Sequence, residues 1–367
     1  MKTYVLVGLI AAAFVYLATP LARHLALQFG AITPPRDRDV HVDPIPRMGG
    51  VALYAGVALA LLLATQIPFL ADVFAENRAI WGVLAGGAIV VAVGVADDVW
   101  DLDWMTKFAG QILGAGVMAW LGVQFYSVPL FGVTVVSGRL SFVLTLVLTV
   151  ALMNAVNFID GLDGLAAGVI AIGGSCFFTY TYLLAVGTGA SSYANAASLL
   201  IVALVGACLG FLPHNVYPAR IFMGDSGSMF LGFVFAAAAI TVTGQIDQAA
   251  VSTTQSFPVF LPLLLPLAVV AVPIMDLVMA LFRRAFTGKS PFAADRKHLH
   301  HRMLDLGHSH PGAVRVIWLW AAVISVGTAS LVALPMGQAG ILTAIGIVVA
   351  TVVSLVPVRA RSEKGST

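Results

Sequence analysis

The stretch from Leu140 to Val156 contains no charged side chain, and comparable apolar stretches recur along most of the chain. A helix needs about 20 mainly apolar residues to cross the hydrocarbon core of a bilayer. Only 10% of the residues are charged, whereas a water-soluble domain carries about 25%. The sequence therefore predicts an all-α integral membrane protein of about eleven transmembrane helices, one for each long apolar stretch. We place them at 4–22, 49–70, 79–96, 107–124, 140–157, 164–186, 195–213, 227–244, 258–282, 313–335 and 337–357.

These spans leave no room for a separate soluble domain. We expect one polytopic membrane domain over residues 1–358, followed by a short cytoplasmic tail over 359–367. Residues 125–138 predict a short β-hairpin between two spans. The net charge of +2 gives no reason to expect nucleic acid as a partner. Two cysteines within apolar stretches indicate neither a disulfide framework nor a zinc site.

Lysine and arginine indicate the orientation, because they concentrate in the cytoplasmic loops of membrane proteins. If the N-terminus lies outside, the inner loops and tail hold every Lys and Arg except Lys2, Arg78 and Arg139. The same arrangement places all 8 histidines inside, and every acid except Asp72, Glu76 and Asp247. We therefore expect a multi-pass protein of the cell inner (plasma) membrane, with its C-terminus in the cytoplasm and its active site on the cytoplasmic loops.

An acidic pair, Asp97 and Asp98, ends the third predicted span. Two neighbouring carboxylates at a helix C-terminus repel each other and the helix dipole. A cation is therefore expected beside them, either a metal ion, Lys107 or a cationic part of the site. The structural alternative is a pair of solvated loop acids.

A second group of polar residues follows the fifth predicted span. Asn157, Asp160 and Asp163 are spaced by three, so a continued helix would place them near one edge. The alternative is a tight inner turn in which Asp163 caps the next helix.

Further polar segments precede the second, eighth and tenth predicted spans. The segment from Asn215 to Ser228 enters the eighth span with small residues, and a helix N-terminus of this kind attracts anions. Asp225 there either caps the helix or binds a metal that bridges to phosphate. Arg47 precedes the second span, where it either holds a phosphate or flanks the membrane. A basic loop contains His298, His300, His301 and Arg302, and its alternative role is contact with anionic lipid. Hard carboxylates beside phosphate favour Mg²⁺, so the pattern predicts phosphoryl chemistry.

Taken in order, these motifs resemble the polyprenyl-phosphate N-acetylhexosamine-1-phosphate transferases over nearly the whole chain. The resemblance implies transfer of a sugar-1-phosphate from a cytoplasmic UDP-sugar to a polyprenyl phosphate in the bilayer, with release of UMP. It implies Mg²⁺ as cofactor, with Mn²⁺ as a substitute, and it is compatible with a homodimer. The implied catalytic residues are Asp97, Asp98, Lys107, Asp160 and Asp163, and the implied metal ligands are Asp225 and Asp98. The implied substrate-binding residues are Arg47, Asn157, Asn215, Phe222, His298, His300, His301 and Arg302.

The histidine loop indicates the sugar. The branch that transfers a muramyl peptide shows three consecutive histidines followed by an acid, whereas Leu299 interrupts the run here and Arg302 follows it. This favours UDP-N-acetylglucosamine over UDP-MurNAc-pentapeptide, and hence the first lipid-linked step of cell-wall or surface polysaccharide synthesis. A transporter is the main alternative from another class, although its polar sites would lie near the midplane and recur in two halves. A CDP-alcohol phosphotransferase would need Ala-Arg where Gly164 and Leu165 stand.

Overall fold

The computed structural model describes residues 1–33, 44–75, 78–125, 127–129, 133–135, 137–187, 195–243 and 307–355, and the single positions 264, 267, 268 and 271. These residues form a helical bundle. Its helices are α1 (Lys2–Gln28), α2 (Gly49–Ala64), α3 (Ala71–Ala75), α4 (Ala79–Trp100), α5 (Trp104–Trp120), α6 (Gly138–Ile159), α7 (Leu165–Gly187), α8 (Ala196–Asn215), α9 (Gly224–Thr243), α13 (His310–Ser330) and α14 (Met336–Leu355).

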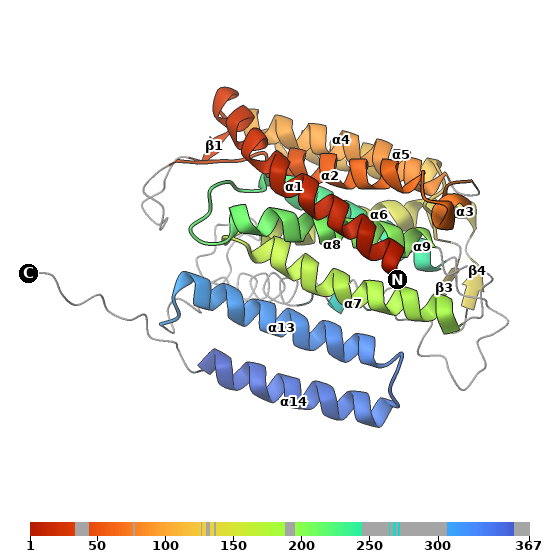
Figure 1. The fold of residues 1–367 in the computed structure, drawn as a ribbon. Coiled ribbons are helices and arrows are strands. Elements are labelled where there is room, and N and C mark those ends of the chain that lie inside the picture. Colours follow the sequence, from red (N-terminus) through yellow and green to blue (C-terminus); the bar gives the residue numbers. More distant parts are fainter. Residues whose placement is uncertain are drawn as a thin grey trace, which may run out of the picture.

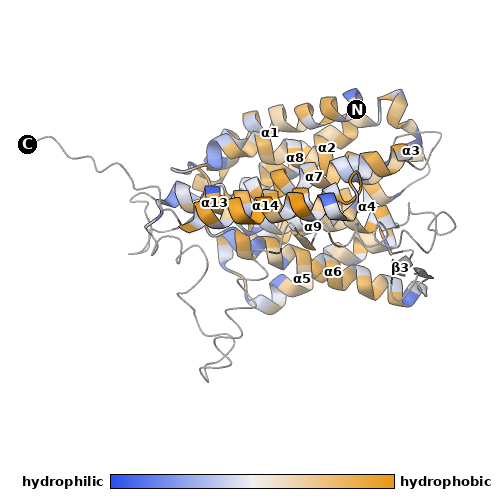
Figure 2. Cartoon of the chain, turned by 90° about the horizontal axis from the view of Figure 1, so that it is seen from below, coloured by the Kyte–Doolittle hydropathy of each residue, from blue (hydrophilic) through white to orange (hydrophobic). Residues whose placement is uncertain are grey.

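Long apolar helices dominate the bundle, which confirms the predicted all-α membrane class. Among the described residues, 8 helices are long and apolar enough to cross a membrane, or 9 if the bent pair Gly49–Ala64 and Pro68–Ala75 is one span. Hydrophobic residues cover the helix shafts, and hydrophilic residues gather near the helix ends (Figure 2). The predicted span at 258–282 lies outside the described residues, apart from those single positions.

The predicted span at 49–70 is wrong as a continuous helix. The chain bends by 98° after α2, and a short 3₁₀ turn (Pro68–Leu70) leads into α3. Pro68 explains the break, because proline lacks the N–H of a helical hydrogen bond and disfavours helical backbone in the residue before it.

Two short antiparallel ribbons accompany the helices. Strand β1 (Ile32–Thr33) pairs with β2 (Ile45–Pro46), so that Ile32 lies opposite Pro46. Strand β3 (Ser127–Pro129) pairs with β4 (Val133–Val135). The second ribbon confirms the hairpin predicted at 125–138.

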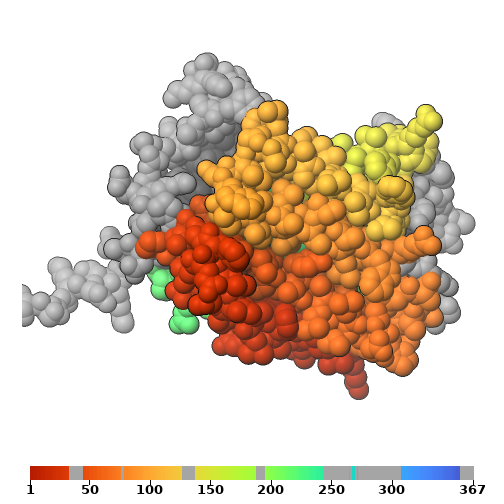
Figure 3. Space-filling model, turned by 90° about the horizontal axis from the view of Figure 1, so that it is seen from above, coloured from red at the N-terminus to blue at the C-terminus, as the bar shows by residue number. Residues whose placement is uncertain are grey.

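Helix α9 is the centre of the bundle. Every residue in it is buried except Asp225 and Thr241, which are partly exposed. It packs against α2, α4, α6 and α8. In the view from above, the residues of α1 to α5 form most of the visible surface of the bundle, in colours from red to orange (Figure 3). A helix that is apolar on all sides is stable in such an enclosed position, and the surrounding helices therefore hold its two ends in place.

Successive helices run in alternate directions along the bundle, as Figure 1 shows. The segments 44–50, 97–107, 157–165 and 215–226 consequently meet at one end, which we call the site end. Hydrogen bonds join each of these segments to the loop or helix start around residues 219–228. The polar segments singled out in the sequence are therefore neighbours in space, with the N-terminus of α9 between them.

Candidate active site

The N-terminus of α9 is capped by a carboxylate from α4. Asp98 Oδ1 accepts a hydrogen bond of 2.9 Å from the backbone N–H of Asp225. Asp98 Oδ2 accepts from the Ser226 hydroxyl at 2.8 Å and from the Ser226 backbone N–H at 3.3 Å. A negative charge is favourable at a helix N-terminus. Asp98 therefore links α4 to α9 and satisfies two of the backbone donors that the first turn of α9 leaves unpaired.

Glycines allow this close approach. Gly224 has a φ of +69°, and a Cβ at this position would overlap the carboxylate of Asp98. Cβ atoms at Gly50 and Gly94 would overlap the backbone of Ser226 from two other helices. The small residues expected at an anion site thus serve first to pack α2, α4 and α9 together.

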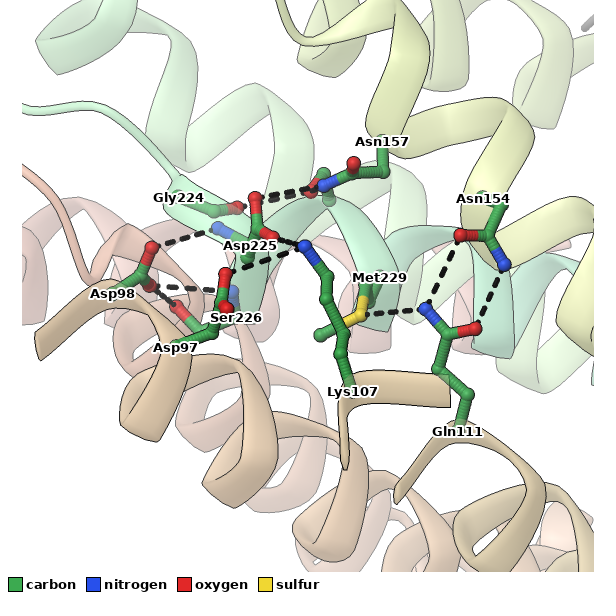
Figure 4. Close-up of polar contacts among 11 residues, drawn as sticks. Asp97, Asp98, Lys107, Gln111, Asn154, Asn157, Gly224, Asp225, Ser226 and Met229 are labelled. Atoms are coloured by element: carbon green, nitrogen blue, oxygen red, sulfur yellow. Dashed lines mark hydrogen bonds and ion pairs between the residues drawn. The ribbon is translucent and has the colours of Figure 1, made fainter. Parts of the chain in front are cut away.

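Lys107 lies between two carboxylates (Figure 4). Its Nζ is 3.3 Å from Asp97 Oδ2 and also contacts Asp225 Oδ2. Side-chain exposures of 21% for Lys107, 11% for Asp97 and 26% for Asp225 leave the group accessible from one side. The sequence predicted a cation beside the acidic pair, with Lys107 as one candidate, and the contact of Lys107 with Asp97 confirms that candidate for Asp97.

Asn157 holds the other oxygen of Asp225. Its Nδ2 donates to Asp225 Oδ1 at 2.9 Å and to Ser228 Oγ at 2.8 Å. Asp225 is therefore oriented by an amide from α6 on one side and by Lys107 from α5 on the other. We call Asp97, Lys107, Asn157 and Asp225 the polar cluster.

Three N–H groups in the first turn of α9 already have partners within the protein. Those of Asp225 and Ser226 donate to Asp98, and that of Gly227 donates to the Met223 carbonyl. A phosphate near this turn would therefore depend on side-chain cations for its binding, chiefly Lys107.

Asp163 and Asn215 join the loop after α6 to the loop before α9. Asp163 Oδ2 accepts from the Ala219 N–H at 2.9 Å. Asn215 Oδ1 accepts from the Gly164 N–H at 3.1 Å, and its Nδ2 donates to the Ile221 carbonyl at 3.0 Å. With exposures of 5% and 2%, both side chains are buried. Their described contacts fix two loops that flank the polar cluster.

The predicted common edge of Asn157, Asp160 and Asp163 does not form. Helix α6 ends at Ile159, and Asp160 is its C-terminal cap. Asn157 therefore faces Asp225, whereas Asp163 faces the loop at Ala219. The alternative placed Asp163 in a tight turn, and residues 160–164 do form a turn between α6 and α7.

The carboxyl of Asp160 is electrostatically unusual. Burial raises its pKa from 3.8 to about 8, and the negative charges of Asp98 and Asp163 act in the same direction. The positive charge of Arg47 opposes them. Asp160 therefore binds its proton more tightly than an ordinary aspartate does, and strongly shifted groups of this kind gather at functional sites.

The segment around Arg47 pairs with the loop before α9. The Phe222 N–H donates to the Pro46 carbonyl at 2.9 Å, and the Gly49 N–H donates to the Phe222 carbonyl at 3.1 Å. The Arg47 N–H donates to the Ala31 carbonyl at 2.9 Å. This places Arg47 and Phe222 at the site end, as predicted. The other predicted binding residues, His298, His300, His301 and Arg302, lie outside the described residues.

Sequence reasoning assigned no role to four polar residues that the structure brings to the site. Ser226 and Ser228 bond Asp98 and Asn157, and Gln111 and Asn154 bond each other one turn away. Gln111 follows Lys107 by four positions, and Asn154 precedes Asn157 by three. That helical spacing was the available signal, because residues three or four apart share a helix face.

Comparison with known proteins gives one family. Residues 80–243 match the model for glycosyl transferase family 4, a range that runs from α4 to α9. The chain is 45% identical to the decaprenyl-phosphate N-acetylglucosaminephosphotransferase of Mycolicibacterium smegmatis, with 100% of this chain and 91% of that protein aligned. The protein of the same name from Mycobacterium tuberculosis is 44% identical over 99% of this chain and 91% of its own length.

A more distant relative bears a related name. It is the Bacillus subtilis protein "Probable undecaprenyl-phosphate N-acetylglucosaminyl 1-phosphate transferase", which is 33% identical over 85% of this chain and 80% of its own length. The similarity to all three relatives extends well beyond the polar cluster, over most or all of the membrane bundle.

Proposed function

The chain belongs to glycosyl transferase family 4, and on that premise we propose that it transfers N-acetylglucosamine-1-phosphate from UDP-N-acetylglucosamine to a membrane polyprenyl phosphate. UMP is released, and polyprenyl-diphosphate-N-acetylglucosamine is the product. The observation that carries the proposal is the polar cluster: two carboxylates, an amide and an ammonium group from four helices, accessible from the end of a membrane bundle.

The polar cluster supports phosphoryl transfer because that reaction depends on positioning and on neutralisation of charge. In the proposed reaction an oxygen of the lipid phosphate attacks the β-phosphorus of the UDP-sugar, and the bond from this phosphorus to the oxygen of UMP breaks. Lys107 binds phosphate oxygens, and Asp97 orients the lipid phosphate. Arg47, on the segment paired with Phe222, adds a second positive charge at the site end.

Mg²⁺ fits the residues present. Mg²⁺ in such sites is typically held by one or two carboxylates, with waters and substrate phosphates as the other ligands. Asn157 and Lys107 each contact one oxygen of Asp225, whose side chain is 26% exposed, and Asp97 is the second carboxylate that Lys107 contacts. The described residues contain no group of three His, Cys, Asp or Glu that would form a cage made by protein alone. When bound, Mg²⁺ would neutralise charge on the diphosphate and on the departing UMP.

Asp98 is a weaker candidate ligand than its position in the sequence indicated. Both of its oxygens accept hydrogen bonds from α9 and the residue is only 7% exposed, whereas the side chain of Asp225 is 26% exposed, so we assign Asp98 to the support of the site. Asp225 therefore remains the proposed metal ligand.

The proposed location is the plasma membrane, with the site end in the cytoplasm, where UDP-sugars are available. The concentration of Lys and Arg in the loops at this end supports that orientation. Single cysteines at Asp103, at the site end, and at Met336, at the other end, test it in a background without Cys176 and Cys208. An impermeant maleimide added to intact cells should label only the cysteine at position 336; labelling only at 103 would reverse the orientation.

The activity test uses purified protein in detergent with Mg²⁺, a polyprenyl phosphate and UDP-N-acetylglucosamine. UMP and a lipid-linked sugar should both form, and Asp225→Asn should abolish both. Asp101→Asn is the matched control, because Asp101 is exposed and has a φ of +54°, a conformation that asparagine also tolerates. Turnover with UDP-MurNAc-pentapeptide but not with UDP-N-acetylglucosamine would show that the proposed donor sugar is wrong. A burst of UMP without the lipid acceptor would exclude direct attack.

A further inference from the structure

A second polar layer lies one helical turn beyond the polar cluster. Asn154 Nδ2 donates to Gln111 Oε1 at 2.8 Å, and Gln111 Nε2 donates back to Asn154 Oδ1 at 3.4 Å. Gln111 Nε2 also lies 3.1 Å from Met229 Sδ. Gln111 is 2% exposed and Met229 is 0% exposed. Figure 4 shows this pair to the right of Lys107 and Asp225.

The members of this layer follow the polar cluster in helical register. Gln111 follows Lys107 by four residues on α5, Met229 follows Asp225 by four on α9, and Asn154 precedes Asn157 by three on α6. Residues at these spacings lie on the same face of a helix. The three helices that supply Lys107, Asn157 and Asp225 are therefore joined a second time, one turn deeper.

We infer that Gln111 and Asn154 are positioning residues, whose paired amides hold α5 and α6 in the register that places Lys107 and Asn157 on Asp225. This inference rests on the proposed function. Gln111 is the buried amide of the pair, whereas Asn154 is partly exposed and its Nδ2 also donates to the Val150 carbonyl at 2.8 Å. An unpaired buried amide costs about 1–3 kcal/mol, so Gln111 depends on Asn154 as its partner. The pair therefore favours one rotation and one height of α5 against α6, a use of buried polar groups known from helix pairs that set register.

The consequence for the site follows from the distances. The second contact of Lys107, to Asp97 Oδ2, is already 3.3 Å long. A shift of α5 by a fraction of a turn would separate Lys107 from at least one carboxylate. Misplacement of a reacting or charge-neutralising group by about 1 Å can lower a rate by about 100-fold. The layer should therefore affect turnover more than substrate binding.

The test compares the variants Gln111→Leu and Asn154→Leu, the double leucine variant, and the reciprocal exchange Gln111→Asn with Asn154→Gln. Asn154→Leu leaves the buried Gln111 amide without this partner, and Gln111→Leu removes the link between α5 and α6 while Asn154 keeps its bond to the Val150 carbonyl. Stability should therefore fall more in Asn154→Leu, and kcat should fall in both, by between about 10-fold and 100-fold. The double leucine variant leaves no unpaired amide, so its stability should recover while kcat stays low. The reciprocal exchange keeps both amides and the summed side-chain length, and it should restore kcat. KM for the UDP-sugar should stay within about twofold of wild type, since the layer makes no substrate contact.

A matched control is the pair Thr181 and Ser198, whose buried hydroxyls lie 2.8 Å apart between α7 and α8. Thr181→Val should lower stability and leave kcat unchanged. If kcat recovers together with stability in the double leucine variant, or if Thr181→Val lowers kcat as much as Gln111→Leu does, the pair is merely structural and the inference is wrong.

A second measurement does not depend on activity. Acetylation of Lys107 by acetic anhydride, followed by mass spectrometry, should be faster in Gln111→Leu and in the double leucine variant than in wild type. The reason is that Lys107 has then lost its paired carboxylates. Equal labelling in all variants would overturn the inference. A wild-type protein that makes no product but shows these labelling differences would instead disprove the proposed function and leave the positioning role standing.

Discussion

Asp98→Asn separates the two roles that this carboxylate has been given, capping of α9 and ligation of a metal. The wild-type carboxylate accepts three hydrogen bonds, from the Asp225 N–H at 2.9 Å, the Ser226 hydroxyl at 2.8 Å and the Ser226 N–H at 3.3 Å. Asparagine keeps one acceptor oxygen and turns an N–H₂ group toward a backbone N–H. One charged hydrogen bond is lost in full, and the remaining ones lose their charge.

A hydrogen bond to a charged group contributes about 1.5–3 kcal/mol, and loss of the charge at a helix N-terminus costs about 0.3–1 kcal/mol more. We therefore expect Asp98→Asn to lower the free energy of unfolding by about 2–4 kcal/mol. The assay is reversible unfolding in mixed micelles, with rising mole fractions of sodium dodecyl sulfate and circular dichroism as the readout. Ser226→Ala, which removes one of the three donors, completes a double-mutant cycle with it.

If Asp98 caps α9, the effects of Asp98→Asn and Ser226→Ala on the free energy of unfolding should be coupled by about 0.5–3 kcal/mol, because both changes act on the same hydrogen bonds. It also predicts that the Mg²⁺ concentration for half-maximal activity is unchanged in the fraction that stays folded. A variant that unfolds within about 0.5 kcal/mol of wild type but requires far more Mg²⁺ would show that Asp98 is a metal ligand. The assignment as a cap would then be refuted.

Three further changes test the packing, the loops and the titration of the site. Gly94→Ala forces a methyl group against the Ser226 backbone and should lower the free energy of unfolding by about 1–3 kcal/mol. Gly116→Ala is the control and should not destabilise the fold, because the nearest atom to a Cβ at this position is 4.0 Å away. Asn215→Ala removes two buried hydrogen bonds and should cost about 2–4 kcal/mol; a raised KM for the UDP-sugar without loss of stability would instead support contact with uracil. The pKa of Asp160 is about 8 in the folded chain, against an ordinary value of 3.8, so the folded chain binds this proton more tightly than the unfolded chain does. Without Mg²⁺, the free energy of unfolding should therefore fall as the pH rises from about 4 to about 8, by at most about 1.4 kcal/mol per pH unit. Asp160→Asn should flatten this slope in unfolding curves taken across that range, and an unchanged slope would contradict the shift.

The class of fold could be predicted because its signal is local. The charge-free stretch at 140–156 lies within α6 and the apolar stretch at 79–96 within α4, and the stretch at 195–213 begins at the N-cap of α8 and otherwise lies within that helix. What failed was the exact extent of spans near proline and glycine. Pro68 ends the helical path of 49–70, and α6 stops at Ile159, just before Gly161. A hydrophobicity pattern does not record the bend at Pro68, because the residues on both sides of this proline are apolar.

The residues that form the site could be predicted more readily than the contacts that they make. Lys107 was among the expected partners of the acidic pair, and it contacts Asp97. The division of labour between Asp97 and Asp98 was not predictable, because it depends on Ser226, which lies 128 positions further along the chain than Asp98. Adjacent residues on a helix point about 100° apart, so one acid faces Lys107 and the other faces α9. Only the packing of α4 against α9 decides which acid does which.

The enclosed position of α9 has a consequence for biogenesis. The helices that pack around it, α2, α4, α6 and α8, all precede it in the chain, and chains are synthesised from the N-terminus. The surrounding helices are therefore in the membrane before α9 leaves the ribosome. Asp98 meets the Asp225 N–H only after 127 more residues have been added. Entry of α9 thus joins these four helices and completes the polar cluster in the same step, so a nascent chain has no such cluster until this helix has inserted.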